Sequence, residues 1–132
     1  MRHLTSHKVN GLNDSIEVRV VDGPGRGSAC HEYRIGNTTP SFVDDIGKEM
    51  ARLNANCVIH FQSGPIGECG LNGISNEALL AVVEDRLVGF QSGDFACREN
   101  ALALTKLQEA MMWLHKRTRD RVARGVEGTD VK

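Results

Sequence analysis

The feature that most limits how this chain can fold is a long segment near its C-terminal end. From Arg98 onward the sequence contains neither proline nor glycine until Gly125. Within this segment a seam of side chains repeats at spacings of three and four residues, at Leu104, Leu107, Met111, Leu114 and Thr118. The repeat predicts one long helix suited to coiled-coil-like packing. Gly125, which follows a basic last turn, predicts where the helix ends.

A shorter helical segment precedes the long one. Ser75 is a suitable N-cap, and from Asn76 to Gln91 an apolar stripe follows helical spacing, through Leu79, Val83, Leu87 and Phe90. The long helix should measure about 36 Å and its partner about two-thirds of that length. Because the shorter helix cannot cover the whole seam, we expect the remainder to pack on the N-terminal half and on another copy of the chain. The sequence therefore predicts an oligomer.

The N-terminal half has the pattern of a small β-sheet. Residues 16–22 alternate apolar and charged side chains, which is typical of a half-buried strand. The glycine-rich segment 23–27 predicts a turn, and residues 29–35 predict the partner strand. Pro40 lies in a break that follows, because the residue before a proline is disfavoured in a helix.

Beyond that break, the spacing predicts a short helix over 42–53 and a third strand over 57–62. The glycine-rich segment 63–73 ends the β half and has room for one further short strand. The predicted fold is α+β: a small antiparallel β-sheet with a short helix, followed by an antiparallel helical hairpin. We expect one compact domain with three parts: a β-rich region 1–74, the hairpin 75–125 and a tail 126–132.

Composition excludes several classes of function. The net charge is −1, so nothing global favours a nucleic-acid polymer or a membrane, and no apolar run is long enough to span a bilayer. The four cysteines form no C-x-x-C pair and the five histidines no H-x-x-x-H pair, which predicts no metal site. No Ser-His-Asp or Cys-His arrangement is supported by spacing. We expect a soluble protein that is not an enzyme and needs no cofactor.

The end of the long helix is strongly basic. Arg117, Arg121 and Arg124 follow i, i+4, i+7 spacing and therefore share one helix face, and Lys116 and Arg119 lie among them. Guanidinium groups gathered in this way repel one another unless they meet an anion or solvent, and their planar fork suits phosphate. The alternative is that this charge only complements the negative end of the helix dipole.

The connector between the two helices, Gly89 to Asn100, is built unlike an ordinary turn. It carries Phe90 beside Gln91, and Asn100 closes it. An aromatic ring can stack on a purine while an amide reads its hydrogen-bonding edge. The alternative is that Phe90 and Phe95 only plug the end of the hairpin.

Phe90 and Asn100 lie at the turn end of the predicted hairpin, and Arg117 lies about 25 Å further along the helix. One chain therefore cannot bring all of them to one small ligand. An antiparallel pair of chains can, because the basic end of one chain would lie beside the turn end of the other.

The run "GFQSGDFACRENALALTKLQEAMMWLHKRTRDRVARGVEGT", residues 89–129, resembles the helical-hairpin domain of two phage immune-evasion families. These are the Thoeris anti-defence one family and the anti-CBASS two family. The β-rich half ahead of the hairpin favours the first, because members of the second are essentially the hairpin alone.

The resemblance implies a sponge: a protein that binds the signalling nucleotides of bacterial defence systems without cleaving them, in the cytoplasm of the bacterial host. The ligands would be glycocyclic ADP-ribose and, in some members, cyclic di- and trinucleotides. It also implies dimers that assemble into hexamers, with pockets between subunits. By position, the pocket residues would be Phe90, Asn100, Arg117 and a further arginine, Arg121 or Arg124.

Two other functions remain open at this point. The first is a small DNA-binding regulator, although the basic residues lie at the C-terminal end of the second helix, whereas recognition helices read bases from their N-terminal residues. The second is a structural phage protein whose hairpin serves only to oligomerise.

Overall fold

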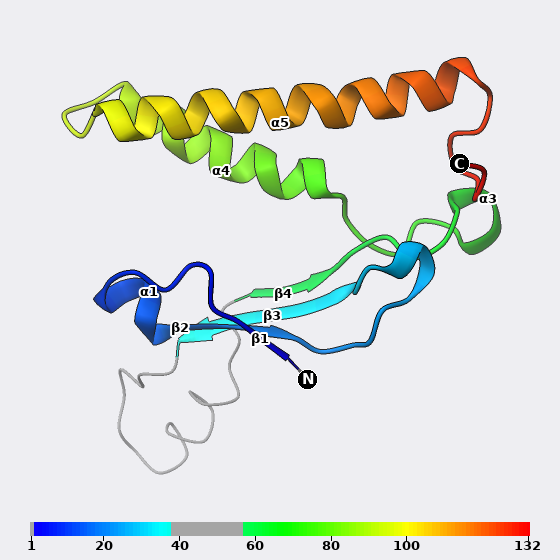
Figure 1. Ribbon diagram of the computed structural model, residues 1–132, viewed down its shortest axis with the longest axis horizontal. Helices are drawn as coiled ribbons and strands as arrows, with labels where there is room; N and C mark the ends of the chain where they lie inside the picture. Colours follow the sequence, from blue (N-terminus) through cyan, green and yellow to red (C-terminus); the bar gives the residue numbers. More distant parts are fainter. Residues whose placement is uncertain (1, 38–56) are drawn as a thin grey trace, which may run out of the picture. The chain divides into compact units, whose positions relative to one another are not determined.

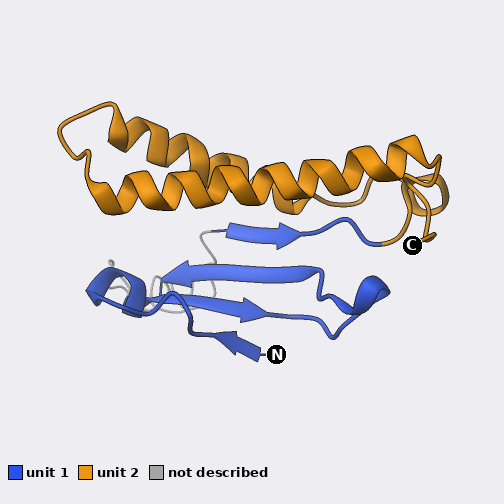
Figure 2. Ribbon diagram, turned by 45° about the horizontal axis from the view of Figure 1, so that its top comes forward, with its two compact units in different colours: residues 1–63 blue, residues 64–132 orange. Residues whose placement is uncertain are grey.

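The structure is a computed structural model that describes residues 2–37 and 57–132, and the chain divides into two compact units, residues 1–63 and 64–132 (Figure 2). Each unit is considered by itself. The helix expected over 42–53, and the break at Pro40, lie outside the described residues.

The first unit is a four-stranded antiparallel sheet in the order β1-β2-β3-β4 (Figure 1). Its strands are β1 (Arg2–Leu4), β2 (Ile16–Val20), β3 (Glu32–Asn37) and β4 (Cys57–His60). The three strands expected from the sequence are therefore confirmed, each with slightly different bounds. Val20 on β2 and Ile59 on β4 are the buried apolar side chains among the described residues of this unit, and Tyr33 contacts Phe61 edge to face, with ring centroids 5.6 Å apart.

Two elements at the N-terminus were not expected from the sequence. Strand β1 is only three residues long, too short for a pattern, and it is defined by pairing with β2, with Leu4 opposite Val18. Helix α1 (Gly11–Ser15) follows an Asn10 cap, whose side chain accepts a hydrogen bond from the backbone N–H of Asn13. A capped single turn has no apolar periodicity, so its signal is confined to the cap.

The turn between β2 and β3 depends on one carboxylate. Asp22 accepts hydrogen bonds from the backbone N–H groups of His31 and Glu32, at 2.8 and 3.0 Å. These two bonds stabilise the ionised carboxylate and lower the pKa of Asp22 below its ordinary value. Gly27 has a φ of 72° within the short helix η1 (Arg26–Ser28), a backbone conformation that suits glycine. The turn is thus longer than the expected one, and β3 begins correspondingly later.

The second unit begins with a short helix, α3 (Ile66–Cys69), so the glycine-rich segment 63–73 forms a helical turn rather than a further strand. Gly70 terminates α3 with a φ of 68°, a left-handed conformation favoured by glycine.

The helical hairpin is confirmed. Helix α4 (Asn76–Gln91) begins at Ser75, whose hydroxyl accepts a hydrogen bond from the N–H of Ala78 at 3.1 Å. Helix α5 (Arg98–Ala123) runs back along it and ends before Gly125, which has a φ of 71°. No described helix is long and apolar enough to cross a membrane.

The seam of α5 is confirmed, and its partner face on α4 is confirmed at two of the four predicted positions. The less exposed positions of α5 include the expected seam and extend it to Asn100 and Arg121. On α4 the predicted Leu79 and Leu87 are among the less exposed positions, together with Leu80, Glu84 and Gln91, whereas the predicted Val83 and Phe90 are exposed. Neither helix has a fully buried residue. The reason for the difference at the C-terminal end of α4 is that Phe90 and Gln91 are used in the connector, as described below.

Candidate functional site

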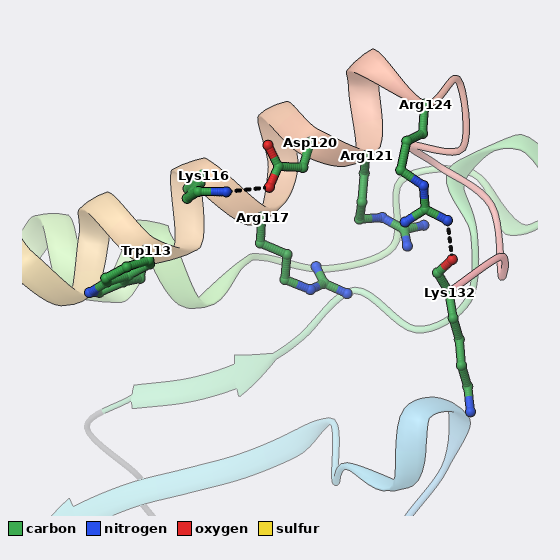
Figure 3. Close-up of a pocket in the computed structure, with 7 residues that line it drawn as sticks. All are labelled: Trp113, Lys116, Arg117, Asp120, Arg121, Arg124 and Lys132. Carbon is green, nitrogen blue, oxygen red and sulfur yellow. Dashed lines mark hydrogen bonds and ion pairs between the residues drawn. The ribbon is translucent and has the colours of Figure 1, made fainter.

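A hollow of about 510 Å³ lies along the C-terminal part of α5, a size usual for small-molecule sites. Its lining residues come from about three turns at the end of the helix and from the tail: Trp113, Lys116, Arg117, Asp120, Arg121, Arg124 and Lys132. Figure 3 shows the three arginine side chains projecting from the same side of α5. The shared face predicted from their spacing is therefore present.

The lining of the hollow is mainly cationic, with five cationic side chains and the carboxylate of Asp120, and Glu127 outside the lining offsets a second of these cations. Lys116 is paired with Asp120 at 2.7 Å, one helical turn away. Arg117 makes no hydrogen bond or ion pair with any residue in the described part of the chain, and it is exposed. Its planar array of donors is thus available for an anion.

Arg121 is in the opposite situation, since its guanidinium is bound by the tail. Nε donates to the Glu127 carboxylate at 3.0 Å, while the two terminal nitrogens donate to three backbone carbonyl oxygens, those of Val126, Thr129 and Val131, at 2.9, 2.9 and 2.5 Å. The Arg121 side chain is only 12 % exposed. In this chain Arg121 therefore organises the tail.

Arg124 also binds the tail, by donating to the carbonyl oxygen of Lys132 (Figure 3). The tail lies close to α3, because a Cβ atom placed on Gly67 would be 3.9 Å from the carbonyl oxygen of Gly128. Arg121 and Arg124 together hold residues 126–132 at the end of α5, and Lys132 forms part of the wall of the hollow.

Phe90 lies at the other end of α5, beside the connector. Its ring contacts Phe95 edge to face, with centroids 6.4 Å apart, and the Arg86 guanidinium lies over it at 5.6 Å. Phe90 remains 42 % exposed and Phe95 is 77 % exposed. Two rings this accessible do not form a closed plug within one chain, which leaves them available for a ligand or a second copy.

Gln91 has a structural task that its sequence position did not reveal. Its amide nitrogen donates to the carbonyl oxygen of Cys97 at 3.1 Å, and its amide oxygen accepts from the N–H of Cys97 at 3.0 Å. By binding both the N–H and the carbonyl oxygen of Cys97, the Gln91 side chain joins the two ends of the connector. This places Gln91 on the face toward α5 and turns Phe90 outward.

Asn100 lies in the first turn of α5 and is partly buried. Its backbone N–H donates to the Sγ atom of Cys97, the N-cap, at 3.4 Å. Its side chain makes no hydrogen bond with the residues that the structure describes. The amide is thus free to contact a ligand.

The five predicted site residues form two groups, not one. Arg117, Arg121 and Arg124 line the same hollow, whereas Phe90 and Asn100 lie next to the connector at the turn end of the hairpin. On the continuous helix α5, Asn100 and Arg117 are about 25 Å apart. One chain does not bring the two groups together.

Trp113 was missed by the sequence analysis. It lines the hollow one helical turn before Arg117, with 58 % of its surface exposed. The available signal was its i, i+4 spacing from Arg117, which places both residues on one side of a helix.

A second hollow, of about 300 Å³, lies between α4 and α5 and is lined by Glu84, Gln108, Met111, Met112, His115 and Arg119. Its one carboxylate balances its one guanidinium, and two thioethers form much of its apolar surface. This chemistry lacks the cationic excess of the first hollow. Among the described residues, no group of three or more His, Cys, Asp and Glu side chains is placed to hold a metal ion.

Comparison with known proteins agrees with this architecture. A protein-family model described as "Acb2/Tad1, hairpin domain" matches residues 53–119, about half of the chain. The match contains Phe90, Asn100 and Arg117 and ends before Arg121 and Arg124. The protein "Thoeris anti-defense 1" of Bacillus phage SBSphiJ7 is 50 % identical over 102 residues, which cover 77 % of this chain and 68 % of that protein. Since identity this high extends well beyond the hairpin, the chain belongs to the Acb2/Tad1 family.

Proposed function

We propose that this protein is an anti-defence sponge, which binds immune signalling nucleotides in the cytoplasm of the bacterial host and holds them without cleaving them. Glycocyclic ADP-ribose is the expected ligand, with cyclic di- and trinucleotides as a second class. Sequestering the signal would keep the host effector inactive. Membership of the Acb2/Tad1 family and half-identity to a phage protein named for Thoeris anti-defence support this function.

The observation that carries the proposal is the exposed guanidinium of Arg117 in a hollow that has five cationic side chains and one carboxylate. Phosphate is the anion that best matches a guanidinium fork, because it accepts two parallel hydrogen bonds. A nucleotide signal with two or more phosphates would neutralise the excess charge of this hollow.

The complete pocket requires two copies of the chain. In a head-to-tail pair, Phe90 and Asn100 of one copy would meet Arg117, with Arg121 or Arg124, of the other. The absence of any fully buried residue in α4 and α5 supports this pairing, since helices with so much exposed apolar surface are stabilised by covering it. We expect such dimers to assemble further into hexamers.

Sequestration places a smaller demand on the site than catalysis. A sponge needs tight binding of the ground state, whereas hydrolysis needs groups that bind the transition state more tightly. Arginine donors, an amide and an aromatic ring satisfy the first demand without an activated nucleophile. We therefore propose that the protein is not an enzyme.

The test is to incubate the protein with glycocyclic ADP-ribose, remove unbound ligand, and denature the complex by heat. Chromatography of the supernatant should return intact glycocyclic ADP-ribose in stoichiometric amount. Release of a linear or hydrolysed product would show an enzyme, and retention of no ligand would reject nucleotide binding. Native mass spectrometry of the same sample gives the oligomeric state and the number of ligands bound.

A further inference from the structure

We propose that the indole of Trp113 is the stacking surface for a planar base of the ligand bound in the cationic hollow. This inference rests on the proposed nucleotide-binding function and adds a residue and a recognition mode to it. Arg117 would bind the phosphates, and Trp113 would select ligands that carry an aromatic ring next to those phosphates.

The position of Trp113 is the first argument. It lines the same hollow as Arg117 and lies one helical turn away, about 6 Å along the axis. Figure 3 shows the indole at one end of the row of cationic side chains. The base and the phosphate of a nucleotide can span such a separation, so both contacts are available to one molecule.

The exposure of the indole is the second argument. A tryptophan is mostly buried in folded proteins, yet Trp113 is 58 % exposed. Within the part of the chain that the structure describes, its ring makes no aromatic or cation–π contact, although Phe90 makes both. The largest aromatic side chain therefore lies more than half exposed at the edge of a mainly cationic hollow.

The charge of the hollow identifies the occupant. An apolar ligand or the apolar face of a second copy would have to approach five cationic side chains, of which Lys116 is paired with Asp120 and Arg121 with Glu127, while Arg117 has no such partner among the described residues. A phosphorylated ligand instead gains from both parts of the surface, because its anion meets the guanidinium groups and its base stacks on the indole. Every nucleobase has a π-face suitable for such stacking.

The chain contains one tryptophan, so its tryptophan fluorescence, excited at wavelengths that tyrosine does not absorb, reports on Trp113 alone. We expect titration with glycocyclic ADP-ribose to quench this fluorescence, because a stacked adenine quenches an indole. Inorganic pyrophosphate supplies the anion without the base and should quench little at equal occupancy. Free N-acetyltryptophanamide, titrated in parallel, corrects for light absorption by the nucleotide.

Substitutions measured by calorimetry separate stacking from packing. We expect Trp113→Ala to weaken binding of glycocyclic ADP-ribose by about 5- to 150-fold, and Trp113→Phe, which keeps a flat ring, by about threefold or less. Pyrophosphate affinity should be unchanged in both variants. Met112→Ala is the matched control, since Met112 is an equally exposed neighbour that lines the other hollow, and it should bind as the parent does.

Each alternative gives a different result. If Arg117→Ala removes binding while both Trp113 variants bind as the parent does, stacking is rejected and the sponge function stands. If Trp113→Ala dissociates the oligomer in native mass spectrometry, the indole is a contact between copies and the inference is overturned. If Arg117→Ala also leaves binding intact, the cationic hollow is not the ligand site and the proposed function fails at this site.

Discussion

The two ends of α5 differ in where their polar groups find hydrogen-bond partners. At the turn end the groups satisfy one another within a few residues: Gln91 binds the backbone of Cys97, and Ser92 donates to the carbonyl oxygen of Gly89. At the basic end, cations outnumber carboxylates and must take backbone carbonyl oxygens from the tail. Within the described part of the chain, the backbone groups of the turn are therefore satisfied locally, with the Asn100 side-chain amide left free, whereas the basic end keeps an unpaired guanidinium at Arg117.

The largest effect expected from this comparison is at Arg117. Because its guanidinium has no protein partner among the described residues, Arg117→Ala should reduce ligand binding by about 1.5–3 kcal/mol with little change in melting temperature. Calorimetry and thermal unfolding measure the two quantities. Arg119→Ala, which removes a cation from the other hollow, is the control and should affect neither. Loss of folding in Arg117→Ala would instead make Arg117 structural.

Substitution of Gln91 should mainly lower stability, whereas substitution of Arg117 should mainly weaken ligand binding. Gln91→Ala removes both hydrogen bonds to Cys97 and should lower the free energy of unfolding by about 1–2 kcal/mol, measured by urea denaturation. Gln91→Glu keeps the acceptor but places a carboxylate against the Cys97 carbonyl oxygen, so it should recover stability only when acid protonates it. If Gln91→Ala were as stable as the parent, the two hydrogen bonds to Cys97 would not be what stabilises the turn end.

A smaller effect is expected in the tail. Glu127→Gln weakens one of the four contacts of Arg121 and leaves its three carbonyl partners in place, so stability should fall by at most about 1 kcal/mol. Hydrogen exchange should be faster in residues 126–131 and unchanged in α4. Arg121→Lys, which cannot reach all four partners, should release the tail more completely. Equal protection in all three proteins would show that other contacts hold it.

The smallest effect on stability is expected in the β2–β3 turn, which lies outside the hairpin and serves as a reference for it. Asp22 has a lowered pKa in the fold, so it stabilises the native state above the pKa of the unfolded aspartate, near 4, and this contribution is lost as the pH falls through the folded value. Acid unfolding followed by circular dichroism should show it. Asp22→Asn should be less stable than the parent at pH 7 and should lose less stability between pH 5 and pH 2.

The sequence predicted most accurately those elements whose signal is local and repeated. The seam of α5 and the Ser75 cap set the bounds of the hairpin, because periodicity and capping both act within a few residues. Strand β1 escaped prediction, since its strand conformation comes from pairing with β2. The face of α4 was predicted correctly at Leu79 and Leu87, but at its C-terminal end Gln91 takes the inward position expected for Phe90, because Gln91 binds Cys97.

The sequence predicted that the arginines of the candidate site share one helix face, but it did not predict which groups they contact. Helical spacing alone placed Arg117, Arg121 and Arg124 on one side of α5. That Arg121 would be occupied by the tail depends on the path of residues 126–132, which carries no pattern in the sequence. Trp113 was missed because its i, i+4 spacing from Arg117 places it on one side of the helix but does not show that this side borders a hollow.

Asn100 and Arg121 lie at opposite ends of one uninterrupted seam, so the length of α5 fixes the distance and the angle between them. Adding or deleting one residue midway would rotate one end by 100° relative to the other and would swing its side chain off the shared face. Adding a whole heptad would nearly restore that angle but would lengthen the helix between the two residues by about 10.5 Å. Natural variation in this helix should therefore occur by substitution, and changes of length should be found in the turn and the tail.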